Sequence, residues 1–308
     1  MRRIALVLAL LTALVPALGG CGGGSDTPTA GTATGDDAAP PLRIGTKNFA
    51  EQFLLGELYK QALEAKGFPV ELKENIGSTE IIHQALNDGA LDMYPEYLGV
   101  LLSEVASVRK RPASPTAAYR AARAYEERNG FTLLGMTPFS DANALAVKPA
   151  FARRNDLKSI ADLAKVPGGV KIGAPPEFRT RFEGLVGLAQ RYRLRTAKAR
   201  PMAIGAQYAA LDSGRVDAAA VFTTDGQLAS GKYVLLDDPR GVFGTQHVAP
   251  IISRAALRTH GPRLQAVIDA VSKRLTAAAM QKMNAAVQLR GRASANVANE
   301  FLRGEGLK

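Results

Sequence analysis

The sequence predicts an α/β fold made of two lobes that follow one plan, and two internal repeats carry this prediction. Residues 43–49, RIGTKNF, recur as residues 171–178, KIGAPPEF, with Ile-Gly in register and only the turn changed. Residues 85–92, ALNDGALD, recur as residues 210–217, ALDSGRVD. The offsets are 128 and 125 residues, and the order of the segments is kept. Two repeats in the same order at nearly equal offsets indicate a duplicated structural unit.

The first lobe begins with the segment 42–53, LRIGTKNFAEQF. Leu42 and Ile44 predict a short apolar strand, a Gly-containing polar turn follows at 45–48, and a helix begins at Glu51. At such a junction the backbone N–H groups and the positive end of the helix dipole point into a crevice, and open α/β folds bind small ligands there. We therefore expect a ligand-binding turn in this segment.

The remaining elements continue the alternation of strand and helix. We expect further strands at 70–74, 92–94, 144–148, 170–174, 216–222 and 250–253. We expect further helices at 78–86, 115–129, 160–165, 180–193, 204–213, 262–287 and 293–302. Ser78 or Thr79 is a natural N-cap, and Gly89 and its repeat equivalent allow a left-handed residue after a helix.

The C-terminal helices lie beyond the second copy of the plan, so some of them should return to pack on the first lobe. We expect crossovers near Ser140 and His247, which place lobe 1 at 42–140 plus 248–308 and lobe 2 at 141–247. Two crossovers give a hinged clamp that closes around a ligand.

The N-terminus has the features of a targeting segment. Arg2 and Arg3 precede an apolar stretch at 4–18, which is too short to span a bilayer, so we interpret residues 1–20 as a signal peptide. The sequence at 18–21, LGGC, resembles a bacterial lipoprotein processing site and predicts lipidation of Cys21; the alternative is a free thiol near an ordinary cleavage site. Cys21 is the only cysteine, so no disulfide is expected.

Residues 21–41 are rich in Gly, Thr, Ala, Asp and Pro and predict a disordered tether with a reach of about 25 Å. The sequence therefore places the protein in the cell envelope, on the extracytoplasmic face, with a lipid anchor.

Composition argues against several classes of function. The formal net charge is +11, but the basic residues are scattered and no nucleic-acid-binding motif is present. Weak attraction to anionic lipid headgroups and a plain solvated basic surface both remain open. The three histidines lack metal-ligand spacing, and no phosphate loop, dinucleotide fingerprint or nucleophile elbow occurs. We expect a binding protein without cofactor or metal rather than an enzyme.

Five motifs resemble those of one known family: TKNFAEQ (46–52), DMYPEY (92–97), PEFRTRFEGL (176–185), FTTDG (222–226) and APII (249–252). They are similar to the substrate-binding proteins of ABC importers for glycine betaine, carnitine and choline. The resemblance covers essentially all of 42–308. It implies a periplasmic-binding-protein fold of the second topological type, a monomer without catalysis, and delivery of a captured solute to a membrane permease.

The resemblance also implies site residues. In that family a cage of tyrosines holds the quaternary ammonium by cation–π attraction, about 0.5–2 kcal/mol per ring. Tyr97 matches one cage position, Phe222 a second without its hydroxyl, and Asn143 and Gln246 fall at the other two. On the carboxylate side the matching basic and polar positions are Lys47, Arg181, Asp141 and Glu177, and Val100 replaces a threonine. The full predicted set is Lys47, Asn48, Gln52, Tyr97, Asp141, Asn143, Glu177, Arg181, Phe222, Thr224 and Gln246.

Replacing half of the cage by amides should weaken cation–π attraction by about 1–4 kcal/mol. We expect a small zwitterion that keeps a carboxylate, with N–H groups at its cationic end that Asn143 and Gln246 accept; weak betaine binding is the alternative. Within the repeat, Tyr97 falls on Phe222, so the two rings should face each other across the cleft. Both could instead be core aromatics. A ligand-sensing envelope lipoprotein, or a binder of an amino-acid-like solute, would use the same clamp.

Overall fold

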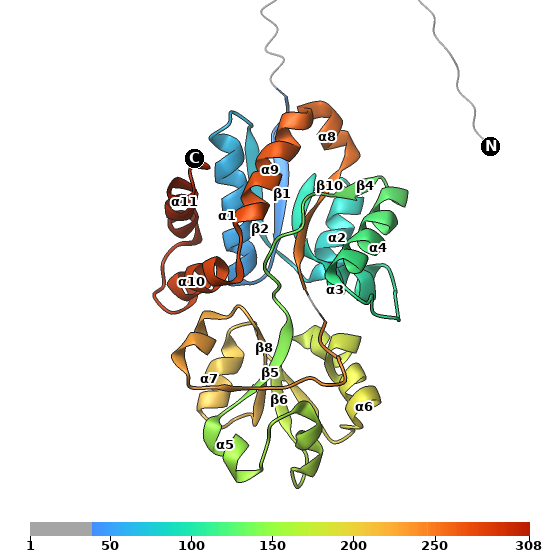
Figure 1. Cartoon of the computed structure of the whole chain (residues 1–308), viewed down its shortest axis with the longest axis vertical. Helices are drawn as coiled ribbons and strands as arrows, with labels where there is room; N and C mark the ends of the chain where they lie inside the picture. The colour runs from blue at the N-terminus through green and yellow to red at the C-terminus, as the bar shows by residue number, and fades with distance from the viewer. Residues whose placement is uncertain (1–38, 245) are drawn as a thin grey trace, which may run out of the picture. The chain divides into compact units, whose positions relative to one another are not determined.

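Two five-stranded sheets organise the residues that the computed structural model describes, 39–244 and 246–308 (Figure 1). The first sheet has the order β2-β1-β3-β10-β4 and the second β7-β6-β8-β5-β9. The strands of the first are β1 (Leu42–Lys47), β2 (Val70–Gly77), β3 (Met93–Tyr97), β4 (Phe131–Leu133) and β10 (Val248–Ser253). Those of the second are β5 (Asn143–Val147), β6 (Lys171–Ala174), β7 (Lys198–Pro201), β8 (Ala218–Phe222) and β9 (Val234–Leu236).

Both sheets have the same pairing pattern. β1 pairs in parallel with β2 and β3, and β6 pairs in parallel with β7 and β8. The fourth strand of each sheet, β10 or β5, is antiparallel to the strands on both of its sides. An isolated bridge between Ser140 and His247 joins the segments that lead into these two strands. The predicted plan of two similar α/β lobes is thereby confirmed.

The aspartate that ends each copy of the repeated segment, 85–92 and 210–217, has the same structural role. The carboxylate of Asp92 accepts a hydrogen bond from the backbone N–H of Arg43 at 2.9 Å, and the carboxylate of Asp217 accepts the equivalent one from Lys171 at 2.8 Å. The glycine before each aspartate, Gly89 or Gly214, has a φ of +70° or +73°, which suits a residue without a side chain. Each ALxxGxxD segment therefore ends a helix, and its aspartate hydrogen-bonds to the backbone of the neighbouring strand, β1 or β6.

Helices cover both faces of the first sheet, so its inner strands β1, β3 and β10 are largely buried, whereas the edge strand β2 is polar and partly exposed. Met93 and Tyr97 join one core with α1 (Ala50–Glu64), while Tyr94 joins the opposite core with α2 (Thr79–Asn87) and α4 (Pro115–Arg128). The first core also includes residues of three C-terminal helices, which lie beside α1 in Figure 1. These are α9 (Pro262–Arg274), α10 (Ala277–Gln288) and α11 (Ser294–Gly304).

The second sheet packs in the same two-sided way with smaller side chains. Leu145, Val147 and Ala218 face one core, and Ala146 and Ala219 face the other. Its helices are α5 (Pro149–Arg154), α6 (Gly187–Tyr192) and α7 (Ala206–Asp212). The remaining short elements are α3 (Leu98–Val100), α8 (Arg254–His260) and the irregular helical segments Leu101–Val105, Ile160–Lys165, Pro176–Arg179, Phe182–Val186 and Gly226–Ser230.

Two predicted helices are broken in the structure. The expected helix 262–287 divides into α9 and α10 because Thr276 is extended and its side chain caps α10 by accepting from the N–H of Ala279. The expected helix 180–193 is regular only in α6, since Glu183 and Gly184 have non-helical dihedral angles. Strands β4, β7 and β9, each of three or four residues, are too short for the pattern to predict.

The predicted signal peptide, the lipidation site Cys21 and nearly all of the tether lie outside the described residues. Within the described ranges, no helix has both the length and the apolar character needed to cross a membrane.

Candidate ligand-binding site

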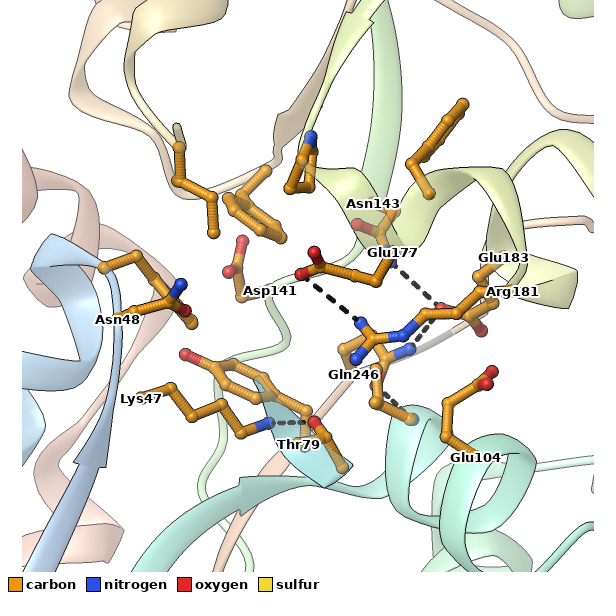
Figure 2. A pocket seen from close by; sticks show the side chains of 17 residues that line it. Lys47, Asn48, Thr79, Glu104, Asp141, Asn143, Glu177, Arg181, Glu183 and Gln246 are labelled. Carbon is orange, nitrogen blue, oxygen red and sulfur yellow. Dashed lines mark hydrogen bonds and ion pairs between the residues drawn. The ribbon is translucent and has the colours of Figure 1, made fainter. Parts of the chain in front are cut away.

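A pocket opens where the parallel strands of both sheets end (Figure 2). Lys47 and Tyr97 end β1 and β3, Phe222 ends β8, and Asn143 and Gln246 lie where the chain enters β5 and β10. This is the edge at which open α/β sheets bind ligands. The lining residues are Lys47, Asn48, Phe49, Thr79, Tyr97, Val100, Glu104, Asp141, Asn143, Pro175, Glu177, Phe178, Arg181, Glu183, Ile204, Phe222 and Gln246.

Nine of the eleven predicted site residues lie on this lining, and Gln52 and Thr224 lie behind it. Gln52 is buried, where it accepts from the N–H of Lys47 at 3.2 Å and donates to the carbonyl of Pro95 at 3.0 Å. The hydroxyl of Thr224 donates to Glu51. Both therefore support the pocket from behind.

A third aromatic ring, Phe49, lines the pocket with Tyr97 and Phe222. It is paired with both of them, whereas Tyr97 and Phe222 form no ring pair with each other among the described residues. The Phe49 ring stacks on Phe222, with 5.2 Å between centroids and an interplanar angle of 17°, and its centroid is 5.9 Å from that of Tyr97. Sequence reasoning missed Phe49, although it is the aromatic residue of the TKNFAEQ turn. The pocket consequently has three adjacent rings.

The Tyr97 side chain is fixed on two sides. Its hydroxyl donates to Oε1 of Glu51 at 2.9 Å, and the Lys47 ammonium lies 4.8 Å from the ring centroid. Burial and the negative charge of Glu51 raise the pKa of Tyr97 well above its usual value, so the ring stays neutral. One face of this π-system already carries a cation from the protein itself.

Both basic residues of the site are paired with carboxylates. Lys47 forms an ion pair with Glu96 and donates to the Thr79 hydroxyl at 2.7 Å. Burial lowers the pKa of Lys47, although Glu96 opposes that shift. Arg181 donates through Nε and Nη2 to the two oxygens of Glu80, at 3.1 and 2.7 Å, and its Nη1 lies 4.0 Å from Glu177. Burial works against the charge of Arg181, but Glu80 and Glu177 raise its pKa.

The two amides converge on a buried carboxylate, Glu183 (Figure 2). Asn143 Nδ2 and Gln246 Nε2 donate to the same oxygen, Oε2, at 3.0 and 2.6 Å, while the other oxygen accepts from Arg111 at 3.1 Å. Burial raises the pKa of Glu183. Glu183 lies within the PEFRTRFEGL motif, but the motif alone did not assign it a role, because its partners lie 40 to 72 positions away.

This network corrects the expectation for Gln246. Its carbonyl oxygen accepts from the N–H of Val100 at 3.1 Å, so both ends of the amide are bonded within the protein and only one lone pair of the oxygen is left for a ligand. The Asn143 nitrogen is directed away toward Glu183, and its own oxygen forms no hydrogen bond with the described residues. Asn143 therefore fits the expected role of an amide acceptor better than Gln246 does.

Buried acidic side chains lie close to the rings: Asp141 lines the same pocket, and Glu51 accepts from the Tyr97 hydroxyl. Asp141 is buried, accepts from the N–H of Thr224 at 3.1 Å, and has a pKa raised well above its usual value by burial and by the charges of Glu51 and Asp225. Burial likewise raises the pKa of Glu51 and of Asp225. Ionising these buried carboxyl groups costs free energy while the pocket is empty. A cation that enters the pocket lies close to them and offsets that cost.

A two-lobed α/β fold with three aromatic rings, paired basic residues and buried carboxylates around one pocket defines a solute-binding protein of the kind that serves ABC importers. The family model for the "substrate binding domain of ABC-type glycine betaine transport system" matches residues 40–304. The chain belongs to this family, whose members work on the extracytoplasmic side together with a permease.

Individual relatives agree with this assignment. A glycine-betaine-binding protein of Pseudomonas aeruginosa is 32% identical over 282 residues, covering 88% of this chain and 90% of that protein. The glycine betaine-binding protein YehZ of Escherichia coli is 29% identical, covering 87% of this chain and 92% of its own. A solved glycine betaine/carnitine/choline ABC transporter protein has a TM-score of 0.69 at 25% identity, with 86% of this chain and 99% of that chain covered.

Proposed function

We propose that this protein captures a small quaternary-amine osmoprotectant of the glycine betaine type and delivers it to its permease. The observation that carries the proposal is the set of rings Phe49, Tyr97 and Phe222 in the same pocket as Lys47 and Arg181. A quaternary ammonium has no N–H to donate, so it is held by ring faces and by nearby negative charge.

The third ring, Phe49, makes the expected loss of cation–π attraction smaller. Phe49 supplies a ring face where the amides Asn143 and Gln246 supply none. Lys47 lies against Tyr97, which reduces what that ring can offer a second cation. Asp141 lines the same pocket, and a cation bound there favours its ionised form and is attracted by it. Betaine binding with moderate affinity fits this arrangement better than the selection of N–H groups by Gln246, whose oxygen is already bonded.

The remaining features of the proposal follow from the N-terminal sequence and the site. The Leu-Gly-Gly-Cys sequence supports a lipid anchor on Cys21, and the protein acts as a monomer. The polar groups of the pocket are bonded so as to hold charge and shape, as in a receptor without catalysis.

A thermal-shift panel on the purified mature protein tests the proposal, with glycine betaine, choline, carnitine, proline betaine, ergothioneine and common amino acids at millimolar concentration. A ligand at 100 times its Kd stabilises by about 2.7 kcal/mol. We expect quaternary amines to shift the transition and amino acids to leave it unchanged, with Kd then measured by calorimetry. A shift with amino acids and none with any quaternary amine would contradict the proposal.

A further inference from the structure

Arg181, one of the two basic residues on the pocket lining, is bound by a carboxylate that the sequence did not point to. Glu80 lies in the first turn of α2 and bonds both Nε and Nη2 of Arg181, 101 positions further along the chain. This bidentate geometry is the one in which a guanidinium binds a free carboxylate most strongly.

The Glu80 carboxylate occupies a complete anion-binding position. Besides Arg181, it accepts from the hydroxyl of Ser78 at 2.5 Å, and it lies at the N-terminus of α2, where a helix favours negative charge. Partial burial opposes ionisation, but the bonds from Arg181 and Ser78 hold the pKa of Glu80 at about 2. The position of Glu80 therefore has the donors and the charge that a ligand's carboxylate needs.

We propose that Glu80 competes with the ligand's carboxylate for Arg181, and thereby sets how strongly the pocket prefers a zwitterion over a simple cation. This inference rests on the proposed function, because it concerns the same pocket and the same class of ligand.

Burial identifies Glu80, rather than Glu96, as the carboxylate that a ligand displaces. Glu96 is wholly buried on Lys47 and also accepts from the hydroxyl of Tyr94, so its release would strand a charge in the core. The Glu80 side chain is 45% exposed, whereas that of Arg181 is 15% exposed. Glu80 can turn into water, where its charge is solvated, and the ligand's carboxylate then replaces its bonds to Arg181, which stays at the pocket.

The competition acts only on ligands with a carboxylate. Glycine betaine must take Arg181 from Glu80 or share the guanidinium with it, and a second carboxylate there is repelled. Choline has the same trimethylammonium head and a hydroxyl in place of the carboxylate, so it leaves the pair of Glu80 and Arg181 intact.

The test measures Kd for glycine betaine and for choline by calorimetry in the wild-type mature protein and in Glu80→Gln. Glutamine keeps the shape and the Ser78 contact but loses the charge. We expect the Kd for glycine betaine to fall by up to about fivefold, since removing the charge of Glu80 ends its competition for Arg181, and the Kd for choline to change by less than about 1.5-fold. Glu64→Gln is the matched control, because Glu64 is exposed on α1 and does not line the pocket; it should change neither value.

An unchanged or weaker glycine betaine affinity in Glu80→Gln, with wild-type binding intact, would overturn the competition and make Glu80 a residue that positions Arg181. A fall in Kd of equal size for both ligands would also overturn it. If neither protein binds any quaternary amine, the proposed function itself fails, so the two failures are distinct.

Discussion

The Phe49 ring lies parallel to the Phe222 ring, with 5.2 Å between their centroids, and so joins the turn after β1 to the end of β8. These turns belong to different sheets. The contact puts an aromatic surface from the first lobe against one from the second, next to Tyr97. The ring that completes the pocket is therefore one that bridges the two lobes.

Phe49→Ala should weaken binding of a quaternary amine by about tenfold. The substitution removes one ring from the cation's surroundings, worth about 0.5–2 kcal/mol, and leaves Phe222 without its stacking partner. Calorimetry with glycine betaine measures the effect, and Phe49→Tyr, which keeps the ring, is the control. If Phe49→Ala binds as tightly as wild type, Phe49 is a packing residue only.

Arg181→Lys should reduce the affinity for glycine betaine by at least about tenfold and affect choline less. Lysine keeps the charge but loses the planar fork that binds a carboxylate bidentately. Parallel titrations with the two ligands separate the loss of a carboxylate contact from a general loss of affinity. Equal losses for both would show that Arg181 acts mainly as a tie between the loop after β6 and α2.

Glu126 should make the protein less stable as the pH rises. Its carboxylate is buried without a hydrogen-bond partner among the described residues, 3.9 Å from His83 Nε2. Burial, followed by the charge of Glu96, raises its pKa to about 7. Between the unfolded value of 4.5 and about 7 the folded state holds the extra proton, so this stabilising contribution is complete below 4.5 and is lost as the pH rises through 7.

Glu126→Gln measures that contribution. Urea unfolding at pH 5 and pH 8 should show wild type losing about 1–3 kcal/mol more than the variant over this interval. His83 lies 3.9 Å from Glu126, so the difference between the two proteins reports the coupled titration of the Glu126 and His83 pair. Parallel pH profiles for the two proteins would show that Glu126 does not titrate in this range.

Thr224→Val should destabilise the protein by about 1–3 kcal/mol, because the buried Glu51 carboxylate loses the hydroxyl that donates to it. Thr224→Ser keeps that donor and should lie close to wild type. Urea unfolding of the three proteins at neutral pH gives the comparison. A valine variant as stable as the serine variant would exclude a structural contribution from this contact.

Local patterns predicted those parts of the fold whose cause is local. The helix end, the glycine with positive φ and the aspartate that ties the next strand lie within eight residues of one another, at 85–92 and again at 210–217. The break between α9 and α10 was not predicted, because apolar spacing continues through Thr276 while the cap depends on one backbone conformation.

The sequence predicted those pocket residues that can be assigned from their type and their position at the end of a strand, such as Tyr97, Phe222 and Lys47. It was not predicted where a side chain acquires its role from a distant partner. Glu183 matters through Asn143 and Gln246, and Glu80 matters through Arg181. Such partners are brought together only by the crossing of the chain between the two sheets.

The Glu51 carboxylate accepts from three side chains that lie far apart in the sequence: Tyr97 of β3, Thr224 after β8 and Asn284 of α10. Of these, only Tyr97 lines the pocket. A solute that tilts the Tyr97 ring must therefore disturb a bond network that ends in α10, where Gln281 is open to solvent. A fluorophore attached at Gln281, on the same helix as Asn284, tests whether occupancy of the pocket is transmitted to the C-terminal helices, and such a response would make them a place to build a biosensor.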